Sequence, residues 1–154
     1  MIKIVVRAPV LSQSGYGEQA RFALRALRRH EDKFDIHLVN ISWGKTGWIS
    51  QDDEERQWID YLLQKTMHYL NHAKEQQQAP KFDMSLQVTI PNEWEKMAPY
   101  NVGYTAGIET TKVAPQWIEK AKLMDRFIVV SNHSKNVYDA TTYVAENQAG
   151  EKMA

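Results

Sequence analysis

A glycine-rich segment, Gly15-Tyr16-Gly17, follows the first apolar run and directly precedes a helical pattern. With Ala20 it matches the spacing G-x-G-x-x-A that dinucleotide-binding proteins place between a strand and a helix. Backbone N–H groups of such a first helical turn can hold a phosphate, and Ser14 adds a hydroxyl group. The structural alternative is that both glycines accommodate a turn with positive φ. The spacing alone leaves both explanations open.

A dinucleotide site is disfavoured by the surroundings of this turn. The fingerprint places its first glycine immediately after the strand and an acidic residue about twenty positions further on, to bind the ribose. In this chain the segment RAPVLSQS comes between strand and glycine, and Asn40 stands near the place of the acidic residue. We therefore do not expect an NAD-dependent oxidoreductase. A phosphate loop is also excluded, because no Gly-Lys-Ser/Thr follows the turn.

Two later segments carry residues that can take part in group transfer. Glu109 follows the fourth apolar run among small and hydroxylic residues such as Thr105. A carboxylate there can accept hydrogen bonds from sugar hydroxyls, or it can cap backbone N–H groups. Ser131 begins the last helical pattern, with His133 and Lys135 directly after it. The structural explanation is a helix cap for Ser131 and solvent exposure for His133.

Metal binding and sugar stacking are two further possibilities raised by residue type. His68 and His72 lie four positions apart on one predicted helix, but the glutamate of H-E-x-x-H is missing, so we expect no metal site. Trp43 and Trp48 flank a glycine-containing loop, where they can stack on sugars, pack over the sheet edge or contact a neighbouring domain.

The elements that must position these residues alternate between strands and helices. Such alternation predicts a single Rossmann-like α/β domain, with a parallel sheet of about five strands and helices on both faces. A capping pair, Asp52 with Glu55, is expected to begin the longest helix, and Pro115 to open a later one. The connection between the third and fourth strands is expected to be largely loop. The expected strands span residues 2–6, 34–41, 84–90, 100–107 and 126–130, and the last helix runs from Ser131 to about Tyr138.

Size and composition bound the function classes. The 154 residues fit one domain, and 43% hydrophobic with 25% charged residues is typical of a globular chain with one core. Nineteen basic and nineteen acidic residues cancel, so no global field attracts nucleic acid. There is no cysteine, which excludes a disulfide framework and a thiolate site. The apolar N-terminal stretch is too short for a signal peptide or a membrane span, so a cytoplasmic location is the expectation.

Three segments together resemble a known family. They read RAPVLSQSGYGEQAR, PNEWE and GYTAGIETTKVAPQWIEKAKLMDRFIVVSNHSKNVY. In residues and spacing they resemble the N-terminal domain of GT-B fold glycosyltransferases of the family 4 (group 1) type. The resemblance runs from the first strand to about Tyr138. Its most specific part is 103–134, where the family shows aromatic-Thr-x-x-x-Glu, then Pro-x-Trp, then a Val-Val-Ser-Asn ending.

The resemblance implies a glycosyltransferase of the hexosyltransferase type, with two facing Rossmann-like domains and the active site between them. The N-terminal domain receives the acceptor, a glycan or another hydroxyl compound, and the nucleotide-sugar is a co-substrate rather than a bound cofactor. No metal is implied. The glycine turn matches the loop that donor phosphates approach. The resemblance places Gly15 and Gly17 at the phosphate loop and Glu109 and Ser131 on the acceptor side. Together with the residue types, this gives Glu109 and His133 as catalytic candidates, and Ser14, Gly15, Tyr16, Gly17, Thr105, Ser131 and Lys135 as candidates for binding phosphate or substrate.

The donor-binding domain of that family, with its paired glutamates, is absent from these 154 residues, and residues 141–154 read as a polar tail. We therefore expect an acceptor-side domain that is inactive or weak unless a C-terminal domain or a partner chain completes the cleft. Self-association through the uncovered face is a further expectation. The alternative is a non-enzymatic Rossmann-like module that docks a partner protein through the Trp43–Trp48 loop and the sheet edge.

Overall fold

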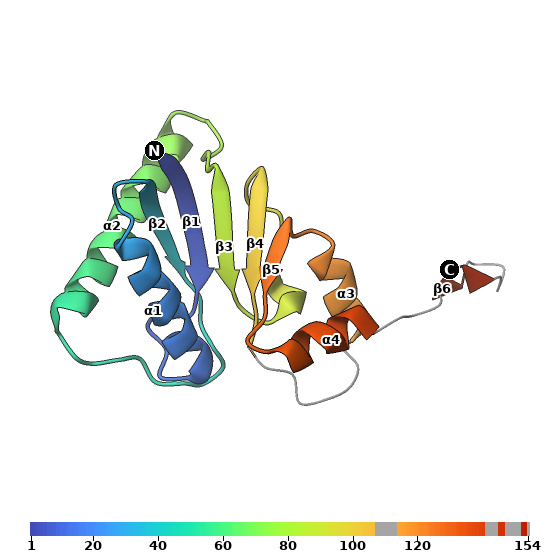
Figure 1. The fold of residues 1–154 in the computed structure, drawn as a ribbon. Coiled ribbons are helices and arrows are strands. Elements are labelled where there is room, and N and C mark those ends of the chain that lie inside the picture. The colour runs from blue at the N-terminus through green and yellow to red at the C-terminus, as the bar shows by residue number, and fades with distance from the viewer. Residues whose placement is uncertain (107–113, 141–144, 147–151, 154) are drawn as a thin grey trace.

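The computed structural model describes residues 1–106, 114–140, 145–146 and 152–153. Its centre is a five-stranded sheet in the order β2-β1-β3-β4-β5, in which all neighbouring strands are parallel (Figure 1). The predicted α/β, Rossmann-like fold with a parallel sheet is confirmed. The strands are β1 (Ile2–Ala8), β2 (Phe34–Asn40), β3 (Met84–Val88), β4 (Tyr100–Tyr104) and β5 (Arg126–Ile128).

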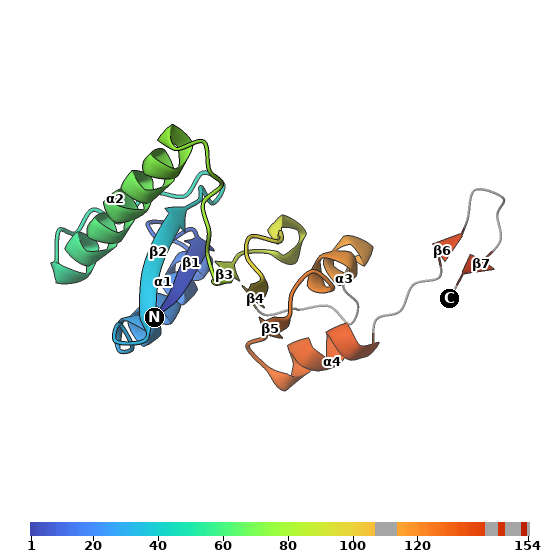
Figure 2. The same ribbon diagram turned by 90° about the horizontal axis from the view of Figure 1, so that it is seen from above.

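The helices lie between the strands, as the sequence pattern predicts. Figure 2 shows α1 on one side of the sheet, and α2, the η1 connection and α3 on the other. The elements are α1 (Gly15–Arg28), α2 (Glu54–Glu75), the 3-10 turn η1 (Pro91–Glu93), α3 (Pro115–Ala121), α4 (Asn132–Ala140) and a short antiparallel pair, β6 (Ala145–Glu146) with β7 (Lys152–Met153). Among the described residues, no helix combines the length and the apolar character that crossing a membrane requires.

Several predicted boundaries are corrected by the structure: β1 extends to Ala8, β3 ends at Val88 and β4 ends at Tyr104. The cap of α2 is Asp53, whose side chain accepts a hydrogen bond from the Arg56 backbone N–H at 2.8 Å, so Asp52 is not the cap. Because both residues are aspartates, the residue type does not show which one caps the helix. The backbone conformation at the start of the helix decides it. Strand β5 ends at Ile128 rather than Val130, and Phe127 and Ile128 are exposed because β5 lies at the edge of the sheet. Pro115 opens α3, as predicted.

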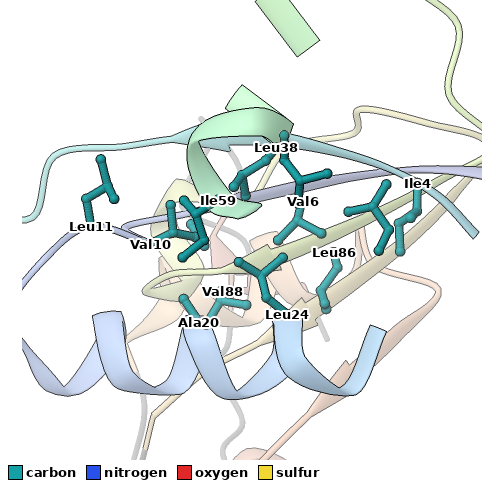
Figure 3. Packing of buried hydrophobic residues seen from close by; sticks show 13 residues of the cluster. Ile4, Val6, Val10, Leu11, Ala20, Leu24, Leu38, Ile59, Leu86 and Val88 are labelled. Atoms are coloured by element: carbon teal, nitrogen blue, oxygen red, sulfur yellow. The ribbon is translucent and has the colours of Figure 1, made fainter. Parts of the chain in front are cut away.

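The main core lies between α1 and one face of the sheet. Ala20 and Leu24 of α1 are fully buried and face Val6, Leu86 and Val88 (Figure 3). Burying a leucine of this kind stabilises the fold by about 2 kcal/mol. This packing fixes the position of α1, and with it the glycine turn at the beginning of the helix.

The opposite face is closed by the connection between β3 and β4, which is mostly loop, as predicted. Trp94 in this connection is fully buried, and its ring lies where a side chain at position 103 would be: a Cβ added to Gly103 would be 2.6 Å from the indole. Buried Asn101 accepts hydrogen bonds from the backbone N–H groups of Met97 and Ala98 at 3.0 and 3.1 Å. The connection is therefore held by side chains of the sheet itself.

A buried histidine lies on β2, at the side covered by α2. His37 is 3% exposed and packs between the rings of Tyr69 and Phe82. Its Nε2 lies 3.3 Å from the Asp35 carboxylate, and Nδ1 has no hydrogen-bond partner among the described residues. Burial lowers the pKa of His37 more than the charge of Asp35 raises it. Burial raises the pKa of Asp35, but the hydrogen bond and charge of Lys65 outweigh this and lower it.

We predict that His37 makes the fold less stable in weak acid. Its pKa is lower in the folded than in the unfolded chain, so below about pH 6.5 protons bind preferentially to the unfolded chain. The free energy of unfolding should fall between about pH 7.5 and 5.5, and the His37→Gln variant should lose less over the same interval. Urea denaturation of both proteins at both pH values measures the difference. Equal losses would show that His37 titrates normally.

Candidate functional site

The predicted phosphate-binding and substrate-binding residues lie at the carboxyl ends of the strands. The sheet order places β1 between β2 and β3, so the crossover direction reverses between β1 and β3. Ligands of open parallel α/β sheets bind in the crevice at such a reversal, beyond the carboxyl ends of the strands. The segment after β1 carries Ser14 to Gly17, and Thr105 directly follows β4 at the same edge.

The two glycines of the turn have different roles. Both belong to the first turn of α1, and neither has a positive φ, so the positive-φ explanation is wrong. A Cβ at Gly17 would lie 2.0 Å from the carbonyl oxygen of Ser12, whereas a Cβ at Gly15 would have nothing within 4 Å. Gly17 is therefore required for close packing of the helix on the backbone, and Gly15 faces open space. Ser14 caps α1: its Oγ accepts a hydrogen bond from the Gly17 N–H at 3.1 Å.

A buried arginine, which sequence reasoning did not identify, holds the segment before the helix. Arg21 is 3% exposed, and its Nη1 donates hydrogen bonds to the carbonyl oxygens of Val10 and Ser12, each at 2.9 Å. Its Nη2 donates to Glu18 at 2.6 Å, and this hydrogen bond lowers the pKa of Glu18. Arg21 thus holds the backbone before α1 in place through hydrogen bonds to its carbonyl groups, and its charge is paired with Glu18.

Tyr16 and Thr105, two of the predicted binding residues, are brought into contact. The Tyr16 hydroxyl lies 3.2 Å from Thr105 Oγ1 and accepts a hydrogen bond from the Ala106 N–H at 3.2 Å. Gln19, not identified from the sequence, donates from Nε2 to the Thr105 carbonyl at 3.0 Å. Thr105 is 1% exposed, so its side chain positions the ends of α1 and β4 relative to each other.

A cluster of hydroxyl groups and an aromatic ring complete this edge. Ser12 Oγ lies 2.8 Å from Ser14 Oγ and 2.6 Å from Thr46 Oγ1. The Trp43 ring packs on Tyr16, with 4.6 Å between the ring centroids. Of the explanations for the two tryptophans, packing at the sheet edge therefore applies to Trp43.

The candidates at the start of α4 make local contacts. Ser131 Oγ accepts a hydrogen bond from the Ser134 N–H at 3.1 Å, which is the helix-cap role. His133 is exposed, and its side chain makes no hydrogen bond within the described part of the chain. Lys135 pairs with Asp139 at 2.8 Å, and this hydrogen bond raises the pKa of Lys135. Glu109 lies outside the described residues.

Tyr138 on α4 was not predicted as a site residue. Its side chain is buried, and its ring packs on Phe127 with 5.0 Å between centroids. Burial, together with the neighbouring Tyr16, raises the pKa of Tyr138, so its phenol stays neutral over the physiological range. A neutral phenol contributes no anionic base to this edge.

What the edge offers is a set of neutral hydrogen-bond donors. The backbone N–H groups of Gly15 and Tyr16 make no hydrogen bond within the described ranges, and the dipole of α1 favours an anion at this end. The Arg7 guanidinium is occupied, since it donates to the Glu93 carbonyl at 2.8 Å and lies 3.7 Å from the Glu95 carboxylate. The geometry suits an anion held by main-chain groups.

Within the ranges given above, no three His, Cys, Asp or Glu side chains are grouped so that they could hold a metal ion. Comparison with protein-family models gave no match, and comparisons with curated proteins and with solved structures gave none either.

We predict that alanine substitutions at Gly17 and Gly15 have different effects on the free energy of unfolding. Gly17→Ala should lower the free energy of unfolding by about 3 kcal/mol, since its methyl group collides with the Ser12 carbonyl. Gly15→Ala, the matched control, should leave stability unchanged or raise it by about 0.5 kcal/mol, because the methyl group meets nothing and the unfolded chain loses freedom. Urea denaturation compares the two, and equal effects would contradict the packing described above.

Proposed function

We propose that the chain is the acceptor-side domain of a nucleotide-sugar-dependent glycosyltransferase of the hexosyltransferase type. One observation carries the proposal. Two of the segments on which the family resemblance rests, although 89 positions apart, meet in space through Tyr16 and Thr105. They meet at the carboxyl edge of the sheet, where α/β proteins bind phosphorylated ligands.

The chemistry requires an anion site of the kind found at α1. In sugar transfer the oxygen of the acceptor hydroxyl forms a bond to the anomeric carbon and gives up its proton, while the bond from that carbon to the nucleoside diphosphate breaks. Negative charge then grows on the leaving phosphate. In this proposal the free N–H groups of Gly15 and Tyr16 and the helix dipole stabilise that charge. The nucleoside itself contacts a second domain or a partner chain.

A pair of substitutions at Gly15 tests the proposal. Gly15→Glu places a carboxylate in the open space before the helix, which should weaken UDP binding at least tenfold by repelling the diphosphate. The fold should be unharmed, since an acidic residue in the first turn of a helix is favourable. Gly15→Gln has nearly the same shape without the charge and should bind UDP within about threefold of the unchanged protein.

The measurement is calorimetric or phosphorus NMR titration of the three proteins with UDP. Equal affinity in the glutamate and glutamine variants would show that the diphosphate binds elsewhere. Failure of the unchanged chain to bind UDP at millimolar concentration would contradict the proposal directly.

A second candidate function, docking of a partner protein, is supported by a different surface. Phe22 on α1 is 67% exposed and Ile128 on β5 is 46% exposed, and both line a groove of about 330 Å³ together with Tyr104. Large exposed apolar patches of this kind mark interaction surfaces.

We predict that the domain on its own associates with itself through this groove. Sedimentation velocity should show concentration-dependent association, and Phe22→Lys should abolish it by placing a charge in the contact. Tyr61→Lys, at a position 60% exposed on α2, is the control and should associate normally. A monomer at every concentration would contradict self-association through this groove.

A further inference from the structure

A cavity of about 480 Å³ lies between the end of β2 and α2, under the loop that carries Trp48. This volume is in the range of small-molecule sites. Its walls are mainly aliphatic. They are formed by Leu11, Leu38, Val39, Leu63, Met67 and Leu70.

The loop over the cavity is fixed by backbone hydrogen bonds. The Ile49 N–H donates to the Leu11 carbonyl, and the Gln13 N–H donates to the Gly47 carbonyl, each at 2.8 Å. Arg56 donates from Nη1 to the Ile49 carbonyl at 2.6 Å. The cavity is thus formed before a ligand arrives, and binding need not order the loop.

The polar groups that line the cavity determine the charge and polarity of the ligands that can bind there. Its two charged residues, Arg56 and Asp60, pair with each other at 2.9 Å, which leaves no free charge for an ionic ligand. Thr66 Oγ1 already donates to Leu62 and accepts from Leu38, both at 2.7 Å.

The side-chain amides of Asn40 and Asn71 also line the cavity. Asn40 accepts from the Leu11 N–H through Oδ1 at 3.3 Å, and its amide NH₂ has no partner within the described residues. The bound part of a ligand is therefore uncharged and mainly apolar, with hydrogen-bonding groups only near Asn40 and Asn71.

Two large apolar side chains at the cavity remain exposed to water. Trp48 is 57% exposed and Met67 is 64% exposed. An apolar ligand in the cavity would cover part of both. The cavity also adjoins the hydroxyl cluster of the candidate site, since Leu11 lines it and the next residue, Ser12, is hydrogen-bonded to Thr46.

We propose that this cavity binds the apolar chain of an alcohol acceptor. The acceptor class is an uncharged amphiphile, whose chain lies against the leucines of α2 and whose hydroxyl lies near the first turn of α1. The acceptor role rests on the proposed glycosyltransferase function, whereas the apolar site rests on the cavity alone.

The test uses the full chain and a series of 1-alkanols from hexanol to decanol, which displace the neutral dye N-phenyl-1-naphthylamine. Affinity should rise about fourfold with each added methylene until the cavity is filled. Met67→Glu places a carboxylate at the cavity on a side chain that is already exposed, and should weaken decanol binding at least tenfold. Tyr61→Glu, equally exposed on the same helix but outside the cavity, is the matched control and should bind decanol normally.

Absence of a chain-length dependence, or equal decanol affinity in the Met67→Glu and Tyr61→Glu variants, would overturn the site. Titrating the same samples with UDP separates the two proposals. Decanol binding without UDP binding refutes the glycosyltransferase assignment and the acceptor role that depends on it, and leaves an apolar-ligand site. Binding of both supports the acceptor role.

Discussion

The first turn of α1 rests directly on the backbone that leaves β1, and this contact requires a residue without a side chain at position 17. A Cβ there would lie 2.0 Å from the Ser12 carbonyl oxygen, closer than any packing can tolerate. Because the helix comes so near, buried Arg21 can reach the carbonyl groups of Val10 and Ser12. The close contact between α1 and this backbone also places the Tyr16 hydroxyl beside the Thr105 hydroxyl across the crevice. The geometry of the whole edge depends on this contact.

The opposite side of the crevice is positioned by polar groups inside the protein. Asn101 and Gln87 are fully buried, and they bind the backbone of the connection that follows β3. An unpaired buried amide is costly, so these hydrogen bonds favour one arrangement of the loop over others. Trp94 can then pack against Gly103 of β4, the strand that Thr105 directly follows. The buried polar contacts of Asn101 and Gln87 thus position the end of β4, and the Gly17 contact positions the start of α1. These two ends meet at the candidate site.

The alternation of strands and helices could be predicted from the sequence because apolar periodicity is a local property. Contacts that join distant positions could not. Gln19 looks like a solvent-exposed helix residue until β4 is placed beside α1, and Arg21 looks like part of a surface stripe until the helix is seen to lie on Ser12. The choice of Asp53 over its neighbour as the cap depends on backbone dihedral angles that two identical residues do not reveal.

The central claim is that an anionic ligand binds where the segments after β1 and β4 meet. The most direct measurement is amide chemical-shift mapping of the ¹⁵N-labelled chain during titration with UDP. We expect the largest shifts at Gly15, Tyr16 and Ala106, and none at Lys33 or Asp83, which lie at the amino ends of the strands. Shifts confined to other surfaces, or no saturable shifts at the first turn of α1, would contradict it.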